Sequence, residues 1–172
     1  MKMILSIAAI VAVASGCASM GGGDGPRAVA SLEPTKGNHT RGTVTFAQRG
    51  DRVRVTAQLS GLKPGAEHGF HIHEKGDCSS GDGMSAGGHF NPAGKPHGPQ
   101  AAPHHAGDMP SVRADSYGNA SASFDLAEVS IGSGAADIVG KGLIVHRDPD
   151  DYKTQPTGNA GPRLACAVIR RG

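Results

Sequence analysis

The segment from residue 52 to residue 59 alternates without exception between polar and apolar side chains. Val53, Val55, Ala57 and Leu59 all fall on one side of the alternation. Successive side chains of a strand point to opposite faces of a sheet, so this pattern predicts a half-buried β-strand. No stretch of the chain has the sustained 3.6-residue period of a long amphipathic helix. The sequence therefore favours an all-β domain.

Similar patterns predict seven further strands. Residues 49–51 and 117–119 have the composition of tight hairpin turns. Eight short strands joined by glycine-rich turns are typical of a β-sandwich or barrel. The length of 172 residues suits one such domain and leaves no room for two ordinary ones. The predicted strands are 28–33, 42–47, 52–59, 68–73, 112–116, 120–126, 143–147 and 164–170.

The charge and the aromatic content exclude two classes of partner. The net charge is only +2, whereas binding to nucleic acid or to a membrane surface needs a concentrated basic face. Four Phe, two Tyr and no Trp are too few for a surface on which bases stack. We expect no nucleic-acid partner.

The first 17 residues have the features of an export signal. Lys2 precedes an apolar run over 3–14 that is too short to span a bilayer. Residues 14–17 resemble the cleavage site of a bacterial lipoprotein, although Ala14 stands where such signals usually carry Leu. In that case Cys17 becomes the lipidated first residue of the mature protein. The alternative is a plain secretory signal cleaved nearby, with Cys17 lost or incidental.

This reading divides the chain into three parts. Residues 1–17 are the signal, the glycine-rich residues 18–27 are a flexible tether, and residues 28–172 are the folded domain. We expect the protein in the bacterial periplasm or cell envelope. Its only membrane contact would be a lipid anchor at Cys17.

The cysteine count agrees with that compartment. Three cysteines are present, and an odd number leaves one thiol unpaired in an exported protein. If Cys17 is lipidated, Cys78 and Cys166 remain to form one disulfide, which an oxidising envelope permits. Such a bond would close a loop of nearly ninety residues and stabilise the fold by roughly 4 to 5 kcal/mol in the chain-entropy estimate.

Histidines occupy matching positions on two predicted strands. His71 and His73 share one face of their strand, and both can reach one ion above the sheet. The alternative is a pair of solvated surface histidines. His146 ends another strand with the same outward parity and could join them. His68 falls on the opposite face with Phe70, so we expect it to be a hydrogen-bonded core residue.

The stretch from residue 74 to residue 110 has no strand pattern, and a loop of that length needs a reason. It contains His89, His97, His104, His105 and Asp108. Three histidines and one aspartate in one loop make a plausible tetrahedral zinc set, which would also order the loop. The alternative is that these histidines are merely exposed.

Six fragments in sequence order resemble the copper/zinc superoxide dismutase family. They are His71-x-His73, the Gly-His-Phe-Asn-Pro run at 88–92, His97-Gly98, His105-x-x-Asp108, Leu143-x-x-His146 and the run over 158–166 that ends in Arg-Leu-Ala-Cys. The resemblance covers residues 28 to 170. The residues at 108–110 and the lipoprotein-like start resemble the bacterial envelope branch.

The resemblance implies an eight-stranded Greek-key β-barrel or sandwich of immunoglobulin-like architecture, with long metal-binding loops. It implies one copper ion and one zinc ion per subunit, with His89 bridging the two. The implied copper ligands are His71, His73, His89 and His146. The implied zinc ligands are His89, His97, His105 and Asp108.

The implied reaction is the disproportionation of superoxide to dioxygen and hydrogen peroxide. Arg163 would attract the anionic substrate over copper, and His89 would supply a proton. Asp150 would link a copper ligand to a zinc ligand. The Cys78–Cys166 disulfide would tie the metal-bearing loop to the last strand.

The sequence departs from familiar eukaryotic members in three places. Cys78 lies farther ahead of His89, and the spacing from His97 to His105 is one residue shorter, with His104 adjacent. The His-x-x-Asp match favours His105 over His104 as the zinc ligand. The segment 147–157 is acidic and carries Lys153 as its one lysine, so other residues would steer superoxide.

Two other functions stay open at this point. The first is a non-enzymatic envelope protein that binds copper and zinc on the same fold. The second is a structural or adhesive sandwich that holds zinc alone. Fold by itself does not decide among them. The oligomeric state is monomer or homodimer.

Overall fold

The computed structural model describes residues 25–172. The predicted signal, Cys17 and residues 18–24 of the predicted tether lie outside the described residues. Strand β1 begins at Arg27, at the end of that tether. Within residues 25–172 no helix has the length and apolar character needed to cross a membrane.

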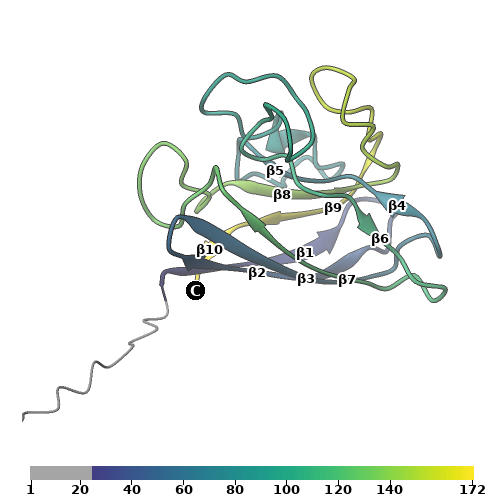
Figure 1. The fold of residues 1–172 in the computed structure, drawn as a ribbon. Coiled ribbons are helices and arrows are strands. Elements are labelled where there is room, and N and C mark those ends of the chain that lie inside the picture. The colour runs from purple at the N-terminus through teal and green to yellow at the C-terminus, as the bar shows by residue number, and fades with distance from the viewer. Residues whose placement is uncertain (1–24) are drawn as a thin grey trace, which may run out of the picture.

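The described chain is almost entirely strand and loop (Figure 1). Its elements follow in the order β1 (Arg27–Pro34), β2 (Arg41–Arg49), β3 (Arg52–Ser60), β4 (Glu67–His68), β5 (Phe70–His73), the 3₁₀ helix η1 (Met84–Ala86), β6 (Val112–Arg113), β7 (Ala120–Leu126), β8 (Gly142–His146), β9 (Arg163–Val168) and β10 (Arg170–Arg171).

The strands form one curled antiparallel sheet and one short ribbon. The sheet order is β5-β8-β9-β1-β2-β3-β7, with β10 paired beside β1, and β4 pairs with β6. The connections from β3 to β5 and from β7 to β8 each cross from one side of this order to the other, as Greek-key connections do. The curled sheet makes a half-barrel in Figure 1. The predicted all-β barrel is confirmed.

The alternating pattern of β3 explains how the barrel fills its interior. Val53 and Val55 are fully buried, and they face Phe46 of β2 within the same core. The β2–β3 pairing runs without a register shift from Arg41 opposite Ser60 to Arg49 opposite Arg52. Burying this apolar face is the main favourable term in the stability of the barrel.

Two of the eight predicted strands are interrupted. The strand predicted over 68–73 breaks at Gly69, whose N–H bonds the Asp148 carbonyl and whose carbonyl accepts from the N–H of His146. The chain thus changes partner there, from β6 to β8. The strand predicted over 164–170 breaks at Ile169, after which β10 pairs with β1.

The long loop follows the free edge of β5 for part of its length. The N–H of Ile72 donates to the Gly107 carbonyl, and the N–H of Phe90 donates to the Ile72 carbonyl. A Cβ atom at residue 107 would overlap the Ile72 carbonyl oxygen, so only glycine allows this approach. The loop histidines therefore lie beside the strand histidines.

Candidate metal centre

Four buried histidines converge beside the paired strands β5 and β8. His71 and His73 come from β5 and His146 from the end of β8. The loop supplies His89, which is held opposite His73 by an isolated β-bridge. All four rings are buried, and one nitrogen of each lies within 4.8 Å of the others.

The outer nitrogen of each strand histidine is already engaged by the protein. His73 Nδ1 donates to the Gly87 carbonyl at 2.9 Å, and His146 Nδ1 donates to the Gly161 carbonyl at 3.0 Å. These bonds fix the tautomer and leave the two Nε2 atoms 3.4 Å apart with lone pairs facing inward. The arrangement presents imidazole lone pairs to one point.

A second set shares His89 with the first. It consists of His89, His97, His105 and Asp108, all buried, with their donor atoms within 4.8 Å of one another. The N–H of His105 bonds Asp108 Oδ2 at 2.9 Å, which closes the short His-x-x-Asp turn. Three imidazoles and one carboxylate are a donor set typical of tetrahedral zinc.

Several inward-facing ring nitrogens have no hydrogen-bond partner although they are buried. His97 Nδ1 is 3.0 Å from Asp108 Oδ2 but lacks hydrogen-bonding geometry. A buried polar atom without a partner is costly, and a metal ion would satisfy it. The residues present therefore fit two metal ions. The unpartnered atoms of the two sets are Nδ1 of His71, Nε2 of His89, Nδ1 of His97 and Nδ1 of His105.

The electrostatics of the two sets differ. Burial lowers the pKa of His71 to about 4 and that of His146 to about 3. Burial opposes the charged form of His97 as well, but the adjacent carboxylates of Asp108 and Asp150 outweigh it and raise its pKa to about 9. Burial likewise disfavours ionised Asp108, yet the hydrogen bond from His89 and the adjacent His97 ring hold its pKa well below the usual range. Burial thus favours the neutral forms of His71 and His146, whereas Asp108 and His97 of the other set stabilise each other as a charged pair.

Asp150 lies between the two sets. Its Oδ2 accepts from His71 Nε2 at 2.8 Å and its Oδ1 accepts from His97 Nε2 at 2.9 Å. Gly158, at φ 63°, packs directly against this carboxylate, and a Cβ there would overlap Asp150 Oδ1. One carboxylate therefore orients a ring from each set.

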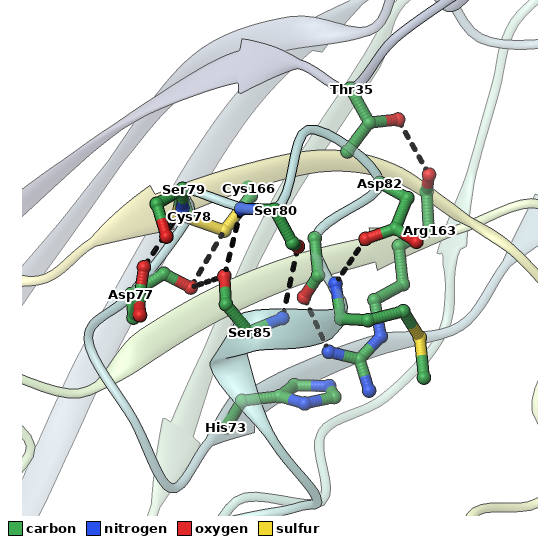
Figure 2. Close-up of a disulfide and its surroundings, with 12 residues drawn as sticks. Thr35, His73, Asp77, Cys78, Ser79, Ser80, Asp82, Ser85, Arg163 and Cys166 are labelled. Atoms are coloured by element: carbon green, nitrogen blue, oxygen red, sulfur yellow. Dashed lines mark hydrogen bonds between the residues drawn. A yellow bond between two sulfur atoms is a disulfide. The ribbon is translucent and has the colours of Figure 1, made fainter.

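Arg163 stands beside the all-histidine set. Its guanidinium donates to the carbonyls of Gly83 and Gly87, each at 2.6 Å, and the Gly87 oxygen also accepts from His73. Figure 2 shows the guanidinium beside the His73 ring. Burial lowers the pKa of Arg163, while the charge of Asp82 raises it. A hollow lined by Lys36, Asp82, Met84 and Arg163 opens beside it.

A disulfide joins the loop to β9. Cys78 and Cys166 are bonded, with their Cα atoms 5.8 Å apart and a separation of 88 positions in sequence. Ser85 Oγ donates to the Asp77 carbonyl next to the bond, as Figure 2 shows. The pairing that remained once Cys17 was set aside is confirmed.

The comparison with known families identifies the family to which this metal centre belongs. Residues 40–169 match the copper/zinc superoxide dismutase family, which is most of the chain. The chain belongs to the copper/zinc superoxide dismutase family.

Individual relatives agree with the family match. A Superoxide dismutase [Cu-Zn] of Paramecium bursaria Chlorella virus 1 is 36% identical over 174 residues, covering 97% of this chain and 90% of that protein. A Superoxide dismutase [Cu-Zn] 2 of Brassica juncea is 42% identical over 151 residues, covering 83% and 96%. The crystal structure of the clock protein EA4 superposes with a TM-score of 0.76 at 39% identity, covering 84% of this chain and 93% of that chain.

Two buried histidines lie outside the donor sets of this superoxide dismutase family member. His104 Nδ1 bonds the Ala102 carbonyl at 2.7 Å, so this ring closes a local turn while its neighbour His105 joins the set. His68 is buried and its Nδ1 bonds the His146 carbonyl at 2.9 Å, as expected for a core histidine. Its bond supports the backbone of β8 behind the site.

Other contributors escaped the sequence reasoning. The carbonyl oxygens of Gly87 and Gly161 carry no side-chain signal, although glycines next to His89 and Arg163 hint at close backbone approach. Gln155, whose side chain bonds the backbone of His97, gave no signal because its partner is 58 residues away.

Proposed function

We propose that this chain is an enzyme that disproportionates superoxide to dioxygen and hydrogen peroxide, with one copper ion and one zinc ion per subunit. The observation that carries the proposal is the pair of buried donor sets that share the single ring of His89. Family membership supports the reaction, and the inward lone pairs support the metals.

The chemistry of the donors favours one metal for each set. Copper would be held by His71, His73, His89 and His146, because imidazole suits copper and a nitrogen-rich set suits its oxidised form. Zinc would be held by His89, His97, His105 and Asp108, whose mixed nitrogen and oxygen donors suit tetrahedral geometry. Bound copper would supply one-electron chemistry and bound zinc a fixed positive charge.

Side chains of the protein hold the proton and attract the substrate. His89 Nε2 faces the copper set and is the ring atom at which a proton can be held and passed to superoxide. Arg163 presents an always-charged planar fork toward the same set, and its two carbonyl acceptors fix its direction. A fixed positive charge at the mouth raises the rate at which a small anion is captured.

A direct comparison tests the activity. The purified full chain, loaded with copper and zinc, is assayed for superoxide dismutation beside His146→Ala. We expect fast, copper-dependent activity that the substitution abolishes. A folded, metal-loaded wild type without activity would instead support the non-enzymatic copper- and zinc-binding protein.

The chain also has the features of an exported lipoprotein of the bacterial envelope. The apolar run over 3–14 and Cys17 support an anchor, and the disulfide suits an oxidising compartment. In a bacterial host, metabolic labelling with a fatty-acid analogue should mark the wild type and not Cys17→Ser. Equal labelling of both, or none of either, would rule out the anchor at Cys17.

A further inference from the structure

The loop after β8 touches the zinc set at more places than Asp150. Tyr152 and Gln155 reach from it to the segment that carries His97, His105 and Asp108, and neither residue has a part in the reaction described above. Both contacts join residues at least 41 positions apart in sequence.

Gln155 engages the backbone of His97 on both sides. Its Nε2 donates to the His97 carbonyl at 2.8 Å, and its Oε1 accepts from the His97 N–H at 2.8 Å. One amide that donates to and accepts from the same residue fixes both the position and the direction of that backbone. The His97 ring is held by Asp150 and Asp108, so Gln155 completes the support of this ligand from behind.

Tyr152 engages the other end of the same segment. Its hydroxyl oxygen accepts from the Ser111 N–H at 2.7 Å and lies 3.2 Å from Ser111 Oγ. The N–H of Asp150 also donates to Ser111 Oγ, and the N–H of Tyr152 donates to Asp150 Oδ1 at 2.7 Å. The tyrosine, Ser111 and Asp150 therefore form one closed set of hydrogen bonds.

The backbone of Tyr152 indicates that its side chain matters. Its φ is 56°, in the left-handed region that bulky residues disfavour and glycine adopts readily. A tyrosine in this conformation must be held by its contacts, and those contacts are with Ser111. The strained position aims the ring at the end of the zinc-bearing segment.

We propose that Tyr152 and Gln155 are positioning residues that hold the zinc set closed. They form hydrogen bonds with the segment that carries the zinc ligands from His97 to Asp108. Gln155 bonds the first ligand, His97, and Tyr152 bonds Ser111, just beyond the last ligand. These bonds thereby slow the release of zinc. The proposal rests on the proposed function in one respect, that zinc occupies this set.

The rate of zinc release tests the proposed role of Tyr152 and Gln155 directly. The full chain, loaded with copper and zinc, is mixed with excess chromogenic chelator, and the rate of zinc transfer is followed. Hydrogen bonds that orient metal ligands are commonly worth tenfold or more in affinity, so Tyr152→Phe and Gln155→Ala should each release zinc about tenfold faster. Tyr117→Phe, at a tyrosine that is 85% exposed, and Gln58→Ala, at an exposed amide, are matched controls and should release zinc at the wild-type rate.

A spectroscopic readout separates positioning from general loosening. Cobalt(II) placed in the zinc set reports the geometry of its ligands through its visible absorption. Gln155→Ala should change that spectrum and both controls should not. Gln155→Glu keeps an acceptor for the His97 N–H and loses the donor, so it should fall between the wild type and Gln155→Ala in both spectrum and release rate.

The outcomes distinguish the two proposals. Wild-type protein that takes up neither zinc nor cobalt would overturn both the zinc assignment and the positioning role of Tyr152 and Gln155. If the wild-type protein binds zinc and both variants release it within twofold of the wild-type rate, the positioning role alone is overturned. If Gln155→Ala fails to fold, Tyr152→Phe and Gln155→Glu, which keep the shape of the side chain, decide by the same criteria.

Discussion

The β2–β3 hairpin and the loop from residue 74 to residue 110 are held in opposite ways. Nine consecutive residue pairs join β2 to β3 without a shift, and the inner side chains are buried among other apolar groups. The loop instead has one three-residue 3₁₀ helix, a disulfide, a few bonds to the edge of β5 and a network of histidines and aspartates.

The difference shows where the two regions obtain their order. The hairpin is stabilised by apolar burial and backbone pairing that need no other component. The loop places buried polar groups together, and these groups are costly until a ligand or a cross-link offsets the cost. The barrel should therefore tolerate losses that the loop does not.

Removal of both metals should produce the largest separation between the two regions. Metal binding supplies folding free energy to the segment that holds the ligands, so chelation should abolish activity and let the chain around the exposed Lys75 and Lys153 unfold locally, which trypsin cleavage requires. We expect cleavage there to accelerate at least about tenfold while Arg52 and Arg54 in the hairpin stay protected. Limited proteolysis followed by mass spectrometry measures this. Equal acceleration at all four sites would mean that the barrel depends on metal as well.

Removal of the disulfide comes next. The double variant Cys78→Ser with Cys166→Ser should lose roughly 4 to 5 kcal/mol of unfolding free energy in the metal-free protein, in the chain-entropy estimate for a long loop. Denaturant titration measures it, and Cys17→Ser, outside the disulfide, should change nothing. A loss below about 1 kcal/mol would show that the loop is ordered mainly by its other contacts.

The stability contributed by the core of the hairpin should not depend on metal. Phe46→Ala removes a fully buried ring and should cost about 3 to 5 kcal/mol, by the same amount with and without metals. Phe124→Ala, at a partly buried ring on β7, should cost less. Thermal unfolding of both variants in metal-free and metal-loaded form tests this. A cost that depended strongly on metal would couple the two regions.

Asp82→Asn tests the mouth of the site and has the smallest expected effect. The Asp82 carboxylate partly offsets the charge of Arg163, and asparagine can still accept from the Met84 N–H. Superoxide consumption should rise by about twofold at low ionic strength and converge with the wild type at high salt. Pulse radiolysis across a salt series measures the rate. Asp51→Asn, in the β2–β3 turn, should have no effect at any salt concentration.

The alternation of side chains along the strands was enough to predict much of this site from the sequence. It put His71, His73 and His146 on one side of the sheet and His68 on the other, because the two-residue period of a strand is local and strict. The barrel followed from the same alternation. The family resemblance added the loop ligands and the arginine, which local patterns do not specify.

The features that were missed depend on distant partners. The break at Gly69 follows from hydrogen bonds to residues 146 and 148, which the sequence near residue 69 does not predict. The same holds for Ser111 and Tyr152, which meet only because two loops cross. The choice of His105 over His104 was not missed, because the His-x-x-Asp match favoured it and the direction of each ring agrees with it.

The sharing of His89 has a thermodynamic consequence. Because one ring belongs to both donor sets, the two proposed ions cannot bind independently. Linkage then requires symmetry: whatever factor zinc contributes to the affinity for copper, copper must contribute to the affinity for zinc. Partial loading of a population would therefore favour molecules with both ions or with neither if the factor is above one, and half-loaded molecules if it is below one.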